Sequence, residues 1–293
     1  MSERLFSVDS TADVVYREVG GIVLHLDLHR PVTDADVPVV AWFHGGAWMV
    51  GERTDQLASR ILPLVRRGIA VAAVQYRLTG QAPFPAQLLD ARAAIDWLRE
   101  HGGEYGLATE RIGAWGSSAG GHLAALLGLE SPLDAAGEPA AEPVPPLAAA
   151  VAAWNAPFDL DAAFARSWLE ELEDPIAQSA ERALVGAPTF DPSDPRHRAA
   201  SPRLLVSPAA APMQFVTGDV DRIVSPTESF RMHDALRLAR VESSVLLVGG
   251  AGHEGAALDA DPNIAMLAAF FRRHLLPPPD AGSQYDNTKE SDR

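Results

Sequence analysis

Short apolar runs alternate with longer amphipathic stretches along most of this chain. The runs are bounded by turn residues and predict buried strands, whereas apolar positions three and four apart predict helices. The expected strands are 13–19, 22–29, 38–43, 69–74, 111–115, 147–154, 213–217 and 244–248. The expected helices are 55–67, 85–101, 119–129, 227–240 and 263–275. This alternation favours an α/β architecture, a mostly parallel sheet with right-handed crossover connections.

The second expected strand has a polar face made of His25, Asp27 and His29, which alternate with three leucines. A period of two is typical of a strand with one buried face. Imidazole and carboxylate groups bind metals, but no further cluster of ligands points to this face. We therefore interpret the face as the wet side of an antiparallel edge strand.

Three stretches break the rhythm of strands and helices. Residues 131–146 are rich in Pro, Ala and Glu and predict a surface loop. Residues 158–210 contain two short acidic helices and a proline-dotted run, and we expect this insertion to cap the strand ends as a cap or lid. The polar tail, 277–293, is expected to be disordered. Residues 1–276 are long enough to bury the core of one large α/β domain.

Composition excludes several classes of function. The formal net charge of −15 argues against nucleic acid and against anionic membranes as partners. The chain has no cysteine, which rules out disulfides, thiolate catalysis and cysteine-bound zinc. No secretory signal is visible, and no apolar run reaches the roughly 18–20 residues of a spanning helix. We expect a soluble cytoplasmic protein.

The strongest chemical signal is Gly116-Ser117-Ser118-Ala119-Gly120, a G-x-S-x-G motif between an expected strand and an expected helix. A turn this tight strains its central residue, so the positions two before and two after it must lack side chains. Gly116 and Gly120 meet that requirement. The turn presents the Ser118 hydroxyl beside a helix N-terminus, where N–H groups face developing negative charge. Ser118 is the candidate nucleophile.

A second motif, His44-Gly45-Gly46-Ala47-Trp48, directly follows an expected strand. Attack on a carbonyl carbon creates an oxyanion, which needs preorganised donors. The N–H groups of Gly45 and Gly46, together with that of Ala119, are the candidate donors of this oxyanion hole, since glycine permits close approach of the backbone.

Two late segments provide a base and an acid. His253 lies in a glycine-rich loop immediately after the strand 244–248, and such a loop can carry the imidazole to Ser118. Asp219 and Asp221 both follow the strand 213–217. We favour Asp221 as the acid that holds the imidazole in the correct tautomer.

From about Val39 to His274 the chain resembles the α/β-hydrolase fold, and within it the hormone-sensitive-lipase-like and bodyguard feruloyl-esterase-like carboxylesterases. The matching segments are HGGAW, YRL at 76–78, FPAQLLDARAAIDWLREHGGEYG, RIGAWGSSAGGHLAALLG and GDVDRIVSP. The resemblance implies a catalytic triad of Ser118, Asp221 and His253, in the chain order of this fold. It also implies a single α/β-hydrolase domain with a mostly parallel eight-stranded sheet, helices on both faces and a small cap insertion.

Two positions depart from the family pattern. Ala47 stands where a third glycine often follows, and Thr217-Gly218 replaces the usual His-Gly before the acidic loop. Neither change affects a member of the expected triad, so we expect both to be tolerated.

These residues predict hydrolysis of a small-molecule carboxylic ester through an acyl-enzyme on Ser118, with no metal or organic cofactor. Two alternatives stay open. One is a kynurenine-formamidase-like amidase, whose oxyanion loop has a similar H-G-G-x-W form, and the other is a non-catalytic ligand-binding protein on the same fold. A dipeptidyl-peptidase-like enzyme is disfavoured because the chain has no room for a propeller domain. The oligomeric state is left open.

Aromatic side chains are the candidates for the substrate pocket. Those we select are Trp48, Phe84, Trp154, Phe158 and Trp168. The insertion contributes apolar residues beyond what two short helices need, namely Phe158, Phe164, Trp168, Leu169 and Phe190. Because the insertion should lie over the carboxyl ends of the strands, we expect at least one of its aromatic residues to line the pocket.

Overall fold

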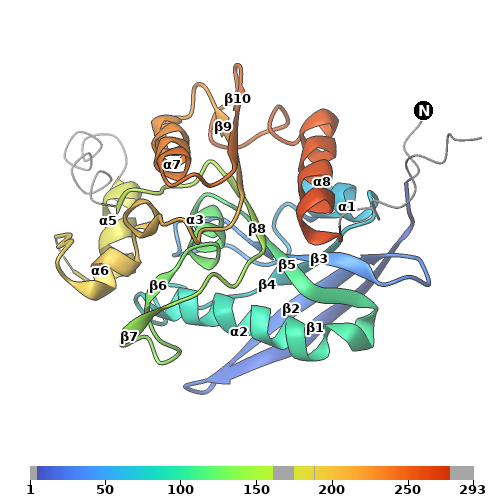
Figure 1. Ribbon diagram of the computed structural model, residues 1–293, viewed down its shortest axis with the longest axis horizontal. Helices are drawn as coiled ribbons and strands as arrows, with labels where there is room; N and C mark the ends of the chain where they lie inside the picture. Colours follow the sequence, from blue (N-terminus) through green and yellow to red (C-terminus); the bar gives the residue numbers. More distant parts are fainter. Residues whose placement is uncertain (1–4, 161–174, 188, 278–293) are drawn as a thin grey trace, which may run out of the picture.

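An eight-stranded sheet with the order β1-β2-β4-β3-β5-β8-β9-β10 forms the centre of the computed structural model, which describes residues 5–160, 175–187 and 189–277 (Figure 1). The strands are β1 (Val8–Val19), β2 (Ile22–Pro31), β3 (Val37–Phe43), β4 (Ala70–Val74), β5 (Leu107–Ser117), β8 (Ala150–Trp154), β9 (Met213–Gly218) and β10 (Ser243–Val248). Every expected strand is therefore confirmed. The β1–β2 and β2–β4 pairs are antiparallel, and the other pairs are parallel.

Helices cover both faces of the sheet, and each face has its own apolar core. On one face lie α2 (Ala86–His101), α3 (Ala119–Leu127) and α7 (Thr227–Leu238), and on the other lie α1 (Leu62–Val65) and α8 (Asp261–Leu275). Strand β3 illustrates the division, since Ala41 and Phe43 belong to the first core and Val40 and Trp42 to the second. Central strands buried on both sides are apolar throughout, which explains their continuous hydrophobic runs.

The parallel register brings the carboxyl ends of six strands, β3, β4, β5, β8, β9 and β10, to one edge of the sheet. Phe43 of β3 pairs with Gly116 of β5, and Ser117 pairs with Trp154 of β8. Further along the sheet, Trp154 pairs with Val216 of β9, and Gly218 pairs with Val248 of β10. Every loop that carries a candidate catalytic residue leaves the sheet at this edge, the usual position of ligand sites in open α/β sheets.

Three expectations about local structure need correction. The expected helix 55–67 is a π-helical turn, Leu57–Ile61, followed by the short α1. The expected surface loop 131–146 contains a hairpin of β6 (Ser131–Leu133) and β7 (Pro139–Val144). The proline-dotted run at 190–205 was not expected to be helical, but it contains the short α6 (Pro195–Ala199). Of the segment before that run, the structure describes α5 (Pro175–Val185), whereas residues 161–174 lie outside the described residues.

The polar face of β2 is not the wet side of an edge strand, because β1 occupies the edge and β2 pairs on both sides. Asp27 and His29 are buried. Arg53 forms an ion pair with Asp27 at 2.9 Å, and His29 shares a hydrogen bond with Ser10. Burial lowers the pKa of His29 below its ordinary value. The Asp27–Arg53 pair holds the β1–β2 hairpin to the loop after β3, and the Ser10–His29 bond joins the two strands of the hairpin.

The expectations about membrane spans, location and the C-terminal tail have different outcomes. In the part of the chain that the structure describes, no helix is both long and apolar enough to cross a membrane. The cytoplasmic location stays a prediction. The polar tail beyond Pro277 lies outside the described residues.

Candidate active site

Ser118 lies at the turn from β5 into α3, with a φ of 54° and a ψ of −123°. A positive φ is strained for a residue with a side chain, so the surroundings must enforce it. The two flanking glycines explain how. A Cβ on Gly116 would overlap the backbone of Gly120, and a Cβ on Gly120 would overlap the carbonyl oxygens of Phe43 and His44. The steric requirement expected from the motif is present.

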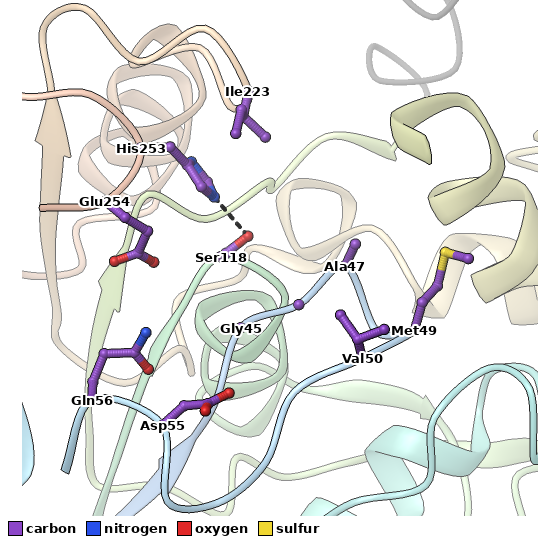
Figure 2. Close-up of a pocket in the computed structure, with 11 residues that line it drawn as sticks. Gly45, Ala47, Met49, Val50, Asp55, Gln56, Ser118, Ile223, His253 and Glu254 are labelled. Carbon is purple, nitrogen blue, oxygen red and sulfur yellow. Dashed lines mark hydrogen bonds between the residues drawn. The ribbon is translucent and has the colours of Figure 1, made fainter. Parts of the chain in front are cut away.

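His253 and Asp221 continue from Ser118 in one line of hydrogen bonds. The Nε2 atom of His253 lies 3.0 Å from the Ser118 hydroxyl oxygen (Figure 2). Its Nδ1 atom lies 2.8 Å from Oδ2 of Asp221. A carboxylate only accepts, so Nδ1 donates to Asp221 and Nε2 is free to accept the serine proton. The structure thus brings together all three residues expected to form the triad.

The two aspartates of the acidic loop have different partners. The Asp221 side chain is buried, and besides His253 it accepts from the N–H groups of Ile223 and Val224 at 2.9 and 3.0 Å. Asp219 accepts from the N–H of Gly250 at 2.6 Å and does not reach the imidazole through any hydrogen bond of the described residues. Asp221 therefore holds the imidazole ring, and Asp219 holds the loop that carries it.

The loop after β3 passes directly beside Ser118. A Cβ on Gly45 would lie 3.4 Å from the Cβ of Ser118, and a Cβ on Gly46 would overlap the carbonyl oxygen of Val50. Gly46 has a φ of 106°, a conformation open to glycine. Ala119 is the first residue of α3, where an N–H has no partner within the helix. Gly45 and Gly46 thus line the same cavity as Ser118, and Ala119 follows it directly, whereas their role as oxyanion donors stays a prediction.

Two features show how the same loop is held in place. The Tyr76 hydroxyl donates to the carbonyl of His44 at 2.9 Å, and the His44 ring stacks on the Tyr76 ring with centroids 4.4 Å apart. Burial lowers the pKa of His44, which keeps the ring neutral. Ala47, at the position where the family resemblance led us to expect a third glycine, has a φ of 55°, so this chain accepts backbone strain there.

Asn155 connects the acidic loop to the loop of the base and was not expected from the sequence. It directly follows β8, is fully buried and has a φ of 46°. Its amide nitrogen donates to the carbonyl of His253 at 2.5 Å, and its amide oxygen accepts from the N–H of Gly218 at 3.1 Å. The only signal available was a polar residue at the end of a buried strand.

A second unexpected group lies behind the imidazole. Arg60 is fully buried and donates to Glu254 at 2.5 Å and to Asp259 at 2.6 Å. Glu254, the residue after His253, also accepts from the Ser117 hydroxyl at 3.0 Å. The neighbours of the nucleophile and of the base are therefore bonded to each other. The guanidinium also lies 5.1 Å from the ring centroid of Trp154.

A cavity of about 520 Å³ opens beside Ser118 and His253 (Figure 2). Its other lining residues are Gly45, Gly46, Ala47, Met49, Val50, Asp55, Gln56, Ile223 and Glu254. Figure 2 shows Asp55, Gln56 and Glu254 on one side of Ser118 and Ala47, Met49 and Val50 on the other, with Ile223 near His253. An ester bound at Ser118 would meet a polar and an apolar surface at once.

The aromatic residues expected to line the pocket lie elsewhere in the described structure. Trp48 packs edge-on against His122, Trp154 against Trp115 and Phe158 against Phe215. Phe84 is buried, and its N–H donates to the carbonyl of Leu184. None of these four belongs to the cavity beside Ser118. They are core residues, because a buried aromatic side chain and a pocket aromatic look alike in a sequence.

The structure describes only some of the apolar residues that we expected in the insertion to line the pocket. Phe164, Trp168 and Leu169 lie outside the described residues. Phe190 is partly buried and stacks on the ring of His197 with centroids 5.6 Å apart. The role of the insertion as a cap stays a prediction.

Comparison with known proteins finds relatives and solved structures that are named esterases. The model of the BD-FAE family matches residues 26–236. Esterase LipQ of Mycobacterium tuberculosis is 29% identical over 78% of this chain and 52% of its own length. An arylesterase of Saccharolobus solfataricus is 36% identical over 36% of this chain and 35% of its own length. The chain thus spans less than two thirds of the curated relatives that it matches.

Solved structures share the fold. A truncated carbohydrate esterase from gut microbiota superposes with a TM-score of 0.74 at 23% identity, covering 93% of this chain and 98% of the other. A thermophilic esterase from Thermogutta terrifontis gives a TM-score of 0.70 at 23% identity, covering 92% of each chain. The expected mostly parallel α/β-hydrolase domain is confirmed.

Proposed function

Because the BD-FAE family model matches most of the chain, the protein belongs to the BD-FAE family, and on this premise we propose that it is a serine hydrolase of carboxylic esters. The observation that supports the proposal most is the line of hydrogen bonds from Asp221 through His253 to Ser118. Relatives named esterase, arylesterase and carboxylic ester hydrolase support the choice of ester over other acyl compounds.

In the proposed reaction, Ser118 attacks the carbonyl carbon of the ester while His253 accepts the hydroxyl proton. The carbonyl oxygen becomes an oxyanion, which the N–H groups of Gly45, Gly46 and Ala119 stabilise. The intermediate collapses, the carbon–oxygen bond to the alcohol breaks, and the alcohol leaves with the proton from His253. Asp221 stabilises the imidazolium while it carries that proton.

The second half of the reaction repeats these steps with water. His253 takes a proton from a water molecule, whose oxygen attacks the carbonyl carbon of the acyl group on Ser118. The bond to the serine oxygen then breaks, the carboxylic acid leaves, and the proton returns from His253 to Ser118. Ser118 and His253 form and break bonds in these steps, whereas Asp221 and the three N–H donors act through hydrogen bonds.

The direct test is mapping of a fluorophosphonate adduct together with turnover of a short aryl ester. The adduct is expected on Ser118, and Ser118→Ala should lower kcat by about five to six orders of magnitude, as in another serine hydrolase. Ser117→Ala is the matched control, because it removes a neighbouring hydroxyl that does not attack, and it should cost far less. An adduct on any other residue would contradict the proposal.

The same preparation distinguishes the two alternative functions. Faster turnover of N-formylkynurenine than of the aryl ester would replace the esterase with an amidase. Absence of both the adduct and ester turnover, in a folded protein, would leave a ligand-binding protein on the hydrolase fold.

A further inference from the structure

The two sides of the cavity beside Ser118 differ in charge. We call Asp55, Gln56 and Glu254 the acidic wall, and Ala47, Met49, Val50 and Ile223 the apolar wall (Figure 2). The apolar wall continues to the surface, where Val50 and Ile223 remain 63% and 61% exposed. Ser118 lies between the walls, so the two halves of a bound ester meet opposite environments.

Nearby arginines do not cancel the charge of the acidic wall. Arg60 is bonded to both Glu254 and Asp259, so these three groups together carry one net negative charge. Asp55 adds a second, and its hydrogen bond from the N–H of Glu52 brings no positive charge. No lysine or arginine is among the described residues that line the cavity. The nearest arginine in sequence, Arg53, is paired with Asp13 and Asp27.

We propose that the cavity selects esters that carry an alkylammonium group on one side of the ester bond and an apolar group on the other. The inference rests on the proposed esterase function and names its substrate class. A cation next to the acidic wall gains attraction, whereas a carboxylate or sulfonate in the same position is repelled. The negative charge of the acidic wall lies in the same cavity as Ser118, so we expect it to change kcat/KM.

Three thioesters of similar shape test this selection. Acetylthiocholine carries the cation, 3,3-dimethylbutyl thioacetate is its neutral counterpart, and 3-sulfopropyl thioacetate carries an anion. Each releases a thiol, which a disulfide reagent detects without background because the protein has no cysteine. At low ionic strength kcat/KM is expected to be about tenfold higher for the cation than for the neutral compound, and about tenfold lower for the anion. Added salt should reduce both ratios.

Two variants separate the wall from the overall charge of the protein. Asp55→Asn removes one charge of the wall and keeps an oxygen for the N–H of Glu52, so the cation-to-neutral ratio should fall about threefold or more. Asp34→Asn removes an equal charge from an exposed position before β3, at the opposite edge of the sheet, and should keep the wild-type ratio.

The outcomes distinguish this inference from the proposed function. Turnover of the neutral thioester without preference for the cation would overturn the selection while leaving the esterase in place. Equal loss of preference in Asp55→Asn and Asp34→Asn would also overturn it, since the effect would then come from the total charge. Failure of Ser118-dependent turnover with all three compounds would reject the esterase itself.

Discussion

The two halves of the active site are held by different forces. The nucleophile elbow, residues 116–120, is shaped by contacts between backbone atoms, because any side chain on Gly116 or Gly120 would overlap a neighbouring main chain. The base loop, residues 249–255, is held by side chains from distant segments, among them Asn155, Asp219 and Arg60. The elbow should therefore be sensitive to added volume, and the base loop to the loss of hydrogen bonds.

The largest expected effect distinguishes the two aspartates that bond to the base loop, Asp221 and Asp219. Asp221→Asn should lower kcat by about four orders of magnitude, since an amide no longer holds the reactive tautomer of His253. Asp219→Asn is the matched control, because the variant keeps an oxygen for the N–H of Gly250 and does not touch the imidazole. Steady-state kinetics on an aryl ester measures both. Comparable losses, or a larger loss in Asp219→Asn, would show that the acid is misassigned.

The next effect is steric and concerns the elbow. Gly120→Ala would drive a methyl group into the carbonyl oxygens of Phe43 and His44. The free energy of unfolding should fall by about 4 kcal/mol or more, because backbone atoms cannot yield as a flexible side chain does. Gly249→Ala in the base loop is the control, since a Cβ there meets nothing within 4 Å. Urea denaturation measures both variants, and equal stabilities would remove the steric basis of the comparison.

A smaller effect tests the pH dependence of the helix behind the elbow. His122 of α3 is fully buried, its Nε2 atom donates to the carbonyl of Ala200, and burial lowers its pKa to about 4. The unfolded chain protonates this histidine near pH 6.5, before the folded protein does. Its stabilising contribution is therefore complete above pH 6.5 and declines as the pH falls towards 4, by about 3 kcal/mol in total.

Urea denaturation across this pH range measures the decline. His122→Gln removes the titrating group, so stability should vary less with pH in the variant than in the wild-type protein. The same slope in both proteins would mean that His122 contributes no pH dependence and that other groups account for it.

The smallest expected effect concerns the bond between Asn155 and the base loop. Asn155→Gly suits the positive φ and deletes both hydrogen bonds, so kcat should fall by about tenfold to a hundredfold as the imidazole loses its position. KM should change by less than about twofold, because Asn155 does not line the cavity. Asn155→Asp keeps the acceptor for Gly218 and loses the donor to His253, so it isolates the second bond. Unchanged kcat in both variants would show that the base loop keeps its position without the hydrogen bonds of Asn155.

The contrast between the two regions also explains what the sequence could predict. The elbow motif is contained in five consecutive positions, so the motif and its neighbouring strand and helix identified Ser118. The strands could be predicted from the sequence because buried central strands need continuous apolar runs. Asp221 and His253 were predicted from their positions directly after two expected strands and from the family resemblance.

The remaining parts of the site depend on contacts that no local pattern encodes. Arg60 meets Glu254 across 194 positions, and Asn155 meets His253 across 98. Trp154 could be recognised as apolar, but whether it faced a cavity or the core was decided by Trp115 and Arg60. The polar face of β2 was misinterpreted for the same reason, since its burial depends on β1 and Arg53.

The span of these bonds also affects the order in which the molecule assembles. The elbow joins β5 to α3, which are adjacent in the chain, and packs Gly120 against the end of β3. The base loop needs the closure of segments farther apart, such as those of Arg60 and Glu254, and such closure is slow. During refolding the helical signal should therefore return first, while Ser118 is already turned outward but has no proton acceptor. The rate at which activity recovers would then report the docking of the base loop. A spectroscopic probe of secondary structure does not detect this step.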